Sequence, residues 1–227
     1  MMEIITVDQK ILKKNEEIAA ELLKKFEDAG VFVINLVSSP GSGKTSLLER
    51  TLKIISPALS VGVIEGDIQT SLDAERISQY NVRVAQIITN GTCHLEARMI
   101  ERAISKINLN DLDLLFIENV GNLVCPSSYY LGEHARVVIM SVTEGEEKPL
   151  KYPAMFLKSR VLILNKVDLL PHLKFDKELA KRYALKINSK LKVFETSCYN
   201  NHGILEWCEW LTEELKLKRQ RSSFENS

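Results

Sequence analysis

One stretch, residues 31–48 (VFVINLVSSPGSGKTSLL), restricts the possible folds more than any other part of the sequence. Residues 31–37 are mostly aliphatic or β-branched, which is typical of a buried strand, and from Thr45 onward the pattern is that of a helix. Residues 38–44 must therefore turn between the two. A glycine-containing turn that leads from a buried strand into a helix directs backbone N–H groups toward a phosphate group.

The turn carries the residue types that bind the β- and γ-phosphates of a nucleotide. Lys44 supplies a mobile positive charge, and the hydroxyl of Thr45 supplies an oxygen ligand for Mg²⁺. The first glycine of the usual G-x-x-x-x-G-K-[ST] pattern is replaced by Ser38. An ordinary glycine-rich turn is the alternative, but the flanking strand and helix favour a phosphate-binding loop. The predicted nucleotide contacts in this loop are Gly41, Ser42, Gly43, Lys44, Thr45 and Ser46.

Strands and helices alternate along the rest of the chain. This alternation predicts an α/β fold with a doubly wound, mostly parallel sheet and helices on both faces, of the P-loop NTPase type. Residues 1–30 are expected to form an amphipathic helix that packs on a domain of residues 31–217, and residues 218–227 a frayed tail. Strands are expected over 31–37, 61–66, 82–87, 113–119, 136–142, 161–164 and 192–196, and helices over 8–29, 45–55, 93–107, 176–187 and 204–217.

Composition excludes several classes of protein. Among the 227 residues, Lys plus Arg and Asp plus Glu number 30 each, so the chain lacks the basic character of a nucleic-acid-binding protein. No apolar run approaches the roughly 18 residues that cross a bilayer, and the first residues do not resemble a secretory signal. A cytoplasmic protein that binds neither nucleic acid nor membrane is expected. Its cysteines are too sparse for a disulfide framework: Cys93, Cys125, Cys198 and Cys208.

Acidic residues follow two of the expected strands. Asp67 comes directly after the strand over 61–66, and Glu118 precedes Gly121 with the E-x-x-G spacing of a variant Walker B and switch segment. The carboxyl ends of parallel strands face the ligand crevice. Asp67 and Glu118 are therefore predicted to reach the Mg²⁺ shell and Gly121 to contact the γ-phosphate, so that these three and Lys44 form the predicted catalytic set. For Asp67, capping of the next helix is the alternative.

The sequence Asn165-Lys166-Val167-Asp168 at the end of a buried strand predicts which base is bound. The Asp168 carboxylate offers two acceptors to N1–H and the exocyclic amine of guanine, whereas adenine would leave it unpaired. Lys166 is expected to lie along the base, and Asn165 to tie this loop to the phosphate loop. Ser197 and Cys198, after another strand, are predicted to close over guanine O6. An ATP enzyme is the alternative, which the order of the motifs disfavours.

Cysteines also lie near strand ends. Cys93 and His94 begin the helix expected over 93–107, where the helix dipole and free N–H groups favour the thiolate, the form that binds metals. Cys125 lies four residues beyond Gly121, next to the segment expected to sense the γ-phosphate. The alternative is that both cysteines are small buried hydrophobic residues and that His94 caps the helix.

Together these segments resemble a known family. SSPGSGKT, EGDIQT, the Cys93-His94 pair, IENVGNLVCPSSY, SVTEGEEKPLKYP and NKVDLL are similar to the HypB family of hydrogenase nickel-incorporation GTPases, from about residue 30 to residue 196. The resemblance implies a GTPase of the metallochaperone type with a G domain, which binds GTP or GDP with Mg²⁺ and forms a nucleotide-dependent homodimer. It also implies delivery of nickel to the hydrogenase large-subunit precursor, together with other nickel-maturation proteins.

The resemblance implies roles for individual residues. Two thiolates and one imidazole suit Ni²⁺ or Zn²⁺ and not Mg²⁺, and three ligands leave coordination positions open for a second subunit, water or an acceptor protein. Because one ligand follows the switch segment, loss of the γ-phosphate is expected to loosen the metal. The family's motifs map onto Lys44 and Thr45 (phosphate), Asp67 and Glu118 (Mg²⁺), Asn165 and Asp168 (guanine), and Cys93, His94 and Cys125 (a metal site shared between subunits).

Two departures from the family pattern change the expectation. Residues 1–30 contain neither His nor Cys, so the nickel storage found in some members is not expected. No residue is an obvious arginine finger or water-positioning glutamine, so slow intrinsic hydrolysis is predicted, with Lys148 or Lys151 as candidates to supply charge across a dimer.

Two other functions stay open at this stage. A urease-type metallochaperone GTPase has a similar fold but usually places His directly after the Cys-Pro pair, where this chain has Ser127. A P-loop small-molecule kinase would use the same phosphate loop, with its cysteines merely buried.

Overall fold

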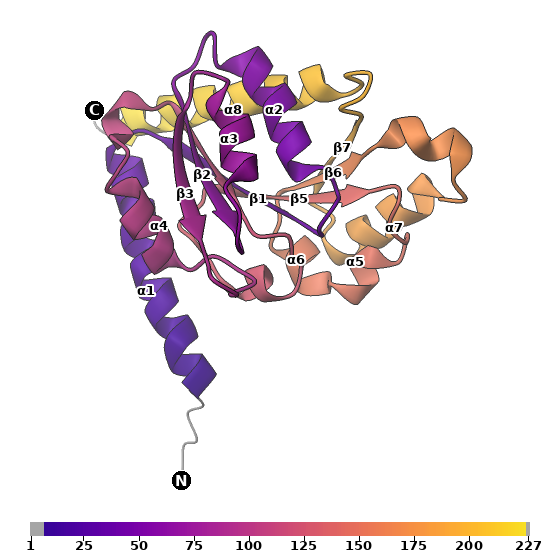
Figure 1. The fold of residues 1–227 in the computed structure, drawn as a ribbon, viewed down its shortest axis with the longest axis horizontal. Coiled ribbons are helices and arrows are strands. Elements are labelled where there is room, and N and C mark those ends of the chain that lie inside the picture. Colours follow the sequence, from indigo (N-terminus) through magenta and orange to yellow (C-terminus); the bar gives the residue numbers. More distant parts are fainter. Residues whose placement is uncertain (1–6, 226–227) are drawn as a thin grey trace.

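Seven strands form one sheet in the computed structural model, which describes residues 7–225 (Figure 1). Every paired neighbour is parallel, in the order β3-β2-β4-β1-β5-β6-β7. The predicted α/β, doubly wound fold is therefore confirmed. The strands are β1 (Phe32–Ser38), β2 (Val61–Asp67), β3 (Arg83–Ile88), β4 (Leu114–Glu118), β5 (Ala135–Ser141), β6 (Val161–Asn165) and β7 (Lys192–Thr196).

The order of the strands places β1 where the chain changes direction across the sheet. After β1 the chain builds β2 and β3 on one side and returns to β4, and it then crosses β1 to continue through β5, β6 and β7. Ligands of open α/β sheets bind at the carboxyl ends of the strands beside such a switch point. The loop after β1 lies there, and all seven residues of β1 are buried.

Helices cover both faces, because strand residues alternate between two apolar layers. In β1, Ile34 and Leu36 pack with the face that carries α2, α3 and α8, whereas Val33 packs with α1 and α4. On that second face, α6 and α7 cover β5 and β6 (Figure 1). The α-helices are α1 (Val7–Asp28), α2 (Lys44–Ile55), α3 (Leu72–Ser78), α4 (Ala97–Ile104), α5 (Lys148–Lys151), α6 (Pro153–Leu157), α7 (Lys177–Ile187) and α8 (Ile204–Glu225), and three short 3₁₀ helices lie at Leu109–Asp111, Cys125–Ser128 and Val167–His172.

Helix α1 packs tightly on this second face. Leu22 and Phe26 are fully buried, and Gly30 has the positive φ of 73° that a chain reversal after a helix requires. The amide of Asn15 donates to the carbonyl of Tyr130 and accepts from the N–H of Ala97. The helix thus contributes polar contacts to segments that are distant in the sequence.

Two helices, α4 and α8, differ from their expected bounds by more than two residues. The helix expected to begin at residue 93 begins at Ala97, because the N–H groups of Leu95 and Ala97 are bound by Asn119 and Asn15 from other elements. The expectation of a frayed tail from residue 218 is wrong for residues 218–225, since α8 continues to Glu225. Lys218 anchors it by donating to the carbonyl of Val31 at 2.7 Å.

Within residues 7–225, no helix combines the length and apolar character needed to cross a membrane.

Candidate nucleotide and metal sites

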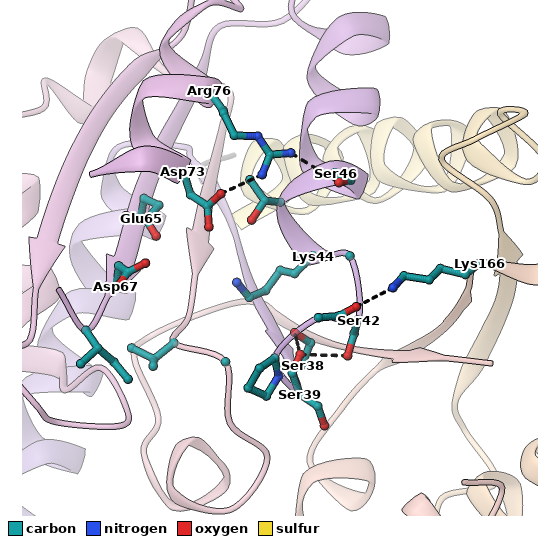
Figure 2. Close-up of a pocket in the computed structure, with 18 residues that line it drawn as sticks. Ser38, Ser39, Ser42, Lys44, Ser46, Glu65, Asp67, Asp73, Arg76 and Lys166 are labelled. Carbon is teal, nitrogen blue, oxygen red and sulfur yellow. Dashed lines mark hydrogen bonds and ion pairs between the residues drawn. The ribbon is translucent and has the colours of Figure 1, made fainter. Parts of the chain in front are cut away.

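A cavity of about 540 Å³ opens at the carboxyl ends of β1 and β2, which are separated in the sheet by β4 (Figure 2). The phosphate loop forms its floor, the acidic residues that end β2 lie on one side, and Lys166 lies on the other (Figure 2). Predicted site residues that line it are Gly41, Ser42, Gly43, Lys44, Thr45, Ser46, Asp67, Gly121 and Lys166.

The shape of the phosphate loop depends on its glycines. Gly41 and Gly43 have φ angles of +75° and +88°, which side chains of L-residues rarely adopt. A Cβ on Gly43 would also lie only 2.6 Å from Nδ2 of Asn165. Gly43 caps α2 without any side-chain hydrogen bond, so the first N–H groups of the helix stay available to an anion.

Three of the predicted site residues, Lys44, Thr45 and Glu118, come together in the structure. The Lys44 ammonium lies 2.7 Å from Oε1 of Glu118, and the Thr45 hydroxyl donates to the same oxygen at 2.6 Å. Glu118 is fully buried, and among the described residues its Oε2 atom has no hydrogen-bond partner. A buried carboxylate oxygen of this kind is costly unless a cation or donor binds it.

Glu65 is a site residue that the sequence analysis missed. It lies opposite Glu118 in the register of β2 and β4, is 2% exposed, and has an Oε2 atom with no partner in the described chain. Burial, reinforced by the Glu118 charge, raises the pKa of Glu65 to about 8. The available signal was its spacing from Asp67, because residues two apart on a strand share a face.

Asp67 lies in the cavity wall, but its carboxylate already accepts hydrogen bonds from the residues that follow it. Its ligand oxygens group with those of Glu65 and Asp73, within 4.8 Å of one another, and not with Glu118. Burial opposes its ionisation, but the N–H groups of Gln69 and Thr70 outweigh that effect and lower the pKa of Asp67. It caps the turn after β2 and not α3, which begins after Ser71.

The predicted guanine loop is tied to the phosphate loop. Asn165 donates to the carbonyl of Ser42 at 2.9 Å, and Lys166 donates to the carbonyl of Gly41 at 2.6 Å. Beyond them, Asp168 accepts a hydrogen bond from the hydroxyl of Ser197. Cys198 lies 3.8 Å from the Asn165 carbonyl oxygen, and burial raises the pKa of its thiol to about 11. The structure thus brings all five predicted guanine-loop residues together.

A second carboxylate reaches the phosphate loop from the segment after β5. Glu144 accepts from the Ser42 hydroxyl at 2.8 Å and from the Ser141 N–H at 2.9 Å, and pairs with Lys148 at 2.9 Å. Burial opposes its ionisation, but these donors lower the pKa of Glu144. Lys148 and Lys151 are therefore both paired within the chain, the latter with Glu147 at 2.7 Å. No local pattern distinguished Glu144 from its charged neighbours.

The predicted metal ligands converge. The ligand atoms of Cys93, His94 and Cys125 lie within 4.8 Å of one another, although the two cysteines are 32 positions apart. The two sulfur atoms are 2.9 Å apart, and the contact with Cys93, followed by burial, disfavours the Cys125 thiolate and raises the pKa of Cys125. Helix α4 begins at Ala97, so Cys93 does not lie at its N-terminus. The prediction that a helix N-terminus favours the Cys93 thiolate is therefore wrong.

His94 is oriented by its surroundings. Its ring stacks on Tyr129 with centroids 4.0 Å apart, and Nδ1 lies 4.0 Å from the Cys93 sulfur. Nε2 lies 3.7 Å from Glu96, and burial lowers the pKa of His94, which favours the neutral ring that binds metals. The sequence analysis did not identify Glu96 as a neighbour of the His94 ring. Its position two residues after His94 could have suggested this, since carboxylates often orient metal-binding histidines.

The segment after β4 connects the phosphate loop with the cluster of Cys93, His94 and Cys125. A Cβ on Gly121 would lie 3.2 Å from Cα of Pro40, so this segment packs directly on the phosphate loop. The next residue, Asn122, donates to the carbonyl of Cys93 at 3.3 Å and accepts from the N–H of Val124 at 2.9 Å. Contact with the nucleotide loop and contact with the cysteines thus involve adjacent residues.

This fold and loop define a P-loop nucleotide-binding protein. A family model described as CobW/HypB/UreG, nucleotide-binding domain, matches residues 31–195. The chain therefore belongs to the CobW/HypB/UreG family of P-loop NTPases, and within it the similarity is to HypB proteins.

Three relatives illustrate that similarity. The hydrogenase maturation factor HypB of Rhizobium leguminosarum bv. viciae is 50% identical over 219 residues, which cover 96% of this chain and 73% of the relative. HypB from Helicobacter pylori in complex with nickel superposes with a TM-score of 0.86 at 38% identity, covering 92% of this chain and 97% of that one. HypB from Archaeoglobus fulgidus gives 0.84 at 36% identity, covering 89% and 99%.

Substitution Gly43→Ala tests the geometry of the phosphate loop. It costs about 1–2 kcal/mol in backbone strain and displaces Asn165, so nucleotide affinity should fall roughly 100-fold in a fluorescent-nucleotide titration. Gly41→Ala is the matched control, because its positive φ is similar but no atom lies within 4 Å of its Cβ position. Equal losses in the two variants would show that contact with Asn165 is unimportant.

Proposed function

We propose that this chain is a GTP-hydrolysing metallochaperone that binds nickel, or zinc, and drives nickel insertion during hydrogenase maturation in the cytoplasm. The observation that carries this proposal is the convergence of Cys93, His94 and Cys125 at the end of a segment that packs on the phosphate loop. The names of the relatives and the nickel-bound Helicobacter pylori structure support it.

GTP is the proposed nucleotide because the loop after β6 presents an Asp168 carboxylate beside Ser197. A second feature fits a bound magnesium ion: the buried Oε2 atoms of Glu65 and Glu118 lack partners among the described residues, and the Thr45 hydroxyl donates to Oε1 of Glu118. We assign Thr45, Glu118 and Asp67 to hold it, with Glu65 next to them. When bound, magnesium neutralises charge on the phosphates.

Hydrolysis by one chain alone is proposed to be slow. Lys44 is proposed to be the cation that contacts the phosphates, and Gly121, which also lines the cavity, is proposed to contact the γ-phosphate through its N–H group. Arg76 also lines the cavity, but the carboxylates of Glu49 and Asp73 hold its guanidinium at 2.6 and 2.8 Å. It is therefore not free to stabilise the developing charge on the phosphate.

Nucleotide state is proposed to control dimerisation and metal affinity. Loss of the γ-phosphate releases Gly121, and the movement passes through Asn122 to both cysteines. Three ligands per chain leave the cargo ion accessible to a second subunit, and from there to the hydrogenase precursor or another nickel-maturation protein. By linkage, metal binding must change nucleotide affinity or dimerisation by the same free energy.

Substitution Cys125→Ala tests the function directly. It should abolish stoichiometric binding of Ni²⁺ and Zn²⁺, measured by chelator competition, and leave GTP affinity within about twofold, because the thiol does not line the nucleotide cavity. Cys208→Ala, which also removes one thiol but lies in α8, should keep both activities. If Cys125→Ala and Cys93→Ala each still bind one ion per chain, the ligand assignment is wrong.

Base selection is tested by Asp168→Asn. An amide pairs poorly with guanine but suits xanthine, so GTP affinity should fall roughly 100-fold and affinity for xanthosine triphosphate should rise. Competition against a labelled nucleotide measures both. Tight ATP binding by the unmodified chain, with transfer of phosphate to a small acceptor, would instead identify a kinase.

The coupling between nucleotide state and metal affinity is tested by Asn122→Ala, which keeps all proposed metal ligands and the phosphate loop. In the unmodified chain, Ni²⁺ affinity and the dimer fraction in size-exclusion chromatography should differ between GDP and a GTP analogue with Mg²⁺. In the variant the difference in Ni²⁺ affinity should shrink toward a ratio of about one, because the bond to the Cys93 carbonyl is lost. An unchanged ratio would show that the hydrogen bond from Asn122 to the Cys93 carbonyl does not carry the coupling.

A further inference from the structure

A second cavity, of about 310 Å³, lies beside the amino ends of β5 and β6. The nucleotide cavity lies at the opposite, carboxyl ends of the strands. Ser127 and Ser128, which follow Cys125, form part of the wall of the second cavity. None of its lining residues belongs to the proposed nucleotide or metal sites.

Two buried donors in its wall lack acceptors among the described residues. The Arg136 side chain is 4% exposed, and its Nη1 atom has no partner there, although its other nitrogens bind Glu133 and the carbonyl of Tyr129. His134 accepts the N–H of Val33 on Nδ1 at 3.0 Å, so its ring proton is on Nε2, which is also buried without a partner. Burial first, and then the Lys218 and Arg160 charges, lower the pKa of His134 to about 3, which keeps that neutral form.

The acidic groups around this cavity do not supply acceptors for all of its hydrogen-bond donors. Glu133 already accepts from Arg136, Asn35 and the N–H of Leu131. Glu16 lies at the exposed rim. Lys158 and Arg160 complete the wall. Both unpartnered groups are donors, and the exposed charged residues beside them are two cations, Lys158 and Arg160, and one acid, Glu16, so the cavity is suited to an anionic acceptor.

The cavity continues into a longer groove. A neighbouring hollow of about 560 Å³ shares Lys158 and Arg160 with it and adds Lys190 and Lys192. Leu157, which is 61% exposed, also lines that hollow. Glu214 pairs with Arg160 at 2.9 Å on its far side. A groove of this extent, with several cations and an exposed leucine, matches an extended segment with several carboxylates better than a single small ion.

We propose that this groove binds an acidic segment of a partner protein, with one carboxylate seated between Arg136, His134 and Lys158. The same wall holds the loop that follows Cys125, since Lys158 donates to the carbonyl of Ser127 at 2.8 Å and Arg136 to that of Tyr129 at 2.7 Å. A carboxylate that competes for these donors acts on the segment that carries the metal ligand. This last consequence rests on the proposed function, whereas the binding itself does not.

The probe is a fluorescein-labelled hexaglutamate peptide with an amidated C-terminus, titrated with the full chain at about 150 mM salt and with EDTA, and followed by anisotropy. Lys158→Gln should weaken binding by about 10-fold. His134→Asn should weaken it by about fivefold, because the Asn oxygen replaces Nδ1 as acceptor for Val33 while the Nε2 donor is lost. Lys53→Gln, the same charge change on an exposed face of α2, should bind as tightly as the unmodified chain.

The proposal is wrong if the peptide shows no saturable binding, or if Lys53→Gln weakens binding as much as Lys158→Gln does. It is also wrong if both cavity variants bind the peptide as tightly as the unmodified chain while their thermal unfolding shows that they are folded. Displacement by inorganic phosphate at the same concentration as by unlabelled peptide would identify a site for free anions instead. Cys125→Ala should keep peptide binding even where metal binding is lost, so failure of the metal assignment and failure of this docking site can be told apart.

Discussion

The contact between Gly121 and Pro40 is the constraint on which the proposed coupling depends. A Cβ at Gly121 would lie 3.2 Å from Cα of Pro40, so a side chain there would require one of the two backbones to shift. Packed interiors transmit displacement because they are nearly incompressible. In the proposed coupling, a change in the phosphate loop therefore displaces Gly121, and the adjacent Asn122 is bonded to the backbone of Cys93, a proposed metal ligand.

Electrostatics explain why a cation is favoured beside Glu65 and Glu118. Parallel pairing of β2 with β4 places Glu65 and Glu118 side by side, both buried. Lys44 and Thr45 satisfy one oxygen of Glu118, while the second oxygen of each carboxyl has no partner in the described chain. Such a pair destabilises the empty site, and a bound cation or a retained proton relieves it. The site is thus organised to favour a charged ligand at the expense of the free state.

The fold and most of the candidate site were predictable because their chemistry is contained in contiguous residues. Strand, glycine turn and Lys44 adjoin one another, as do the residues from Asn165 to Asp168. Glu65 and Glu144 were missed because they reach the phosphate loop through strand register and a folded-back loop, which no local pattern records. The start of α4 was misplaced for a related reason. Side chains from α1 and the segment after β4 bind its preceding N–H groups, and this tertiary bonding overrides helix propensity.

The residues after Cys125 show how this proposed metal ligand can be held and still be displaced. The carbonyls of Ser127, Tyr129 and Tyr130 are bound by Lys158, Arg136 and Asn15, which belong to three separate elements. On the other side of the cysteine, Gly121 is fixed against the phosphate loop. A short segment anchored at both ends has few alternative positions, so a shift at either anchor is not absorbed by general flexibility. It must change the position of the sulfur between the anchors.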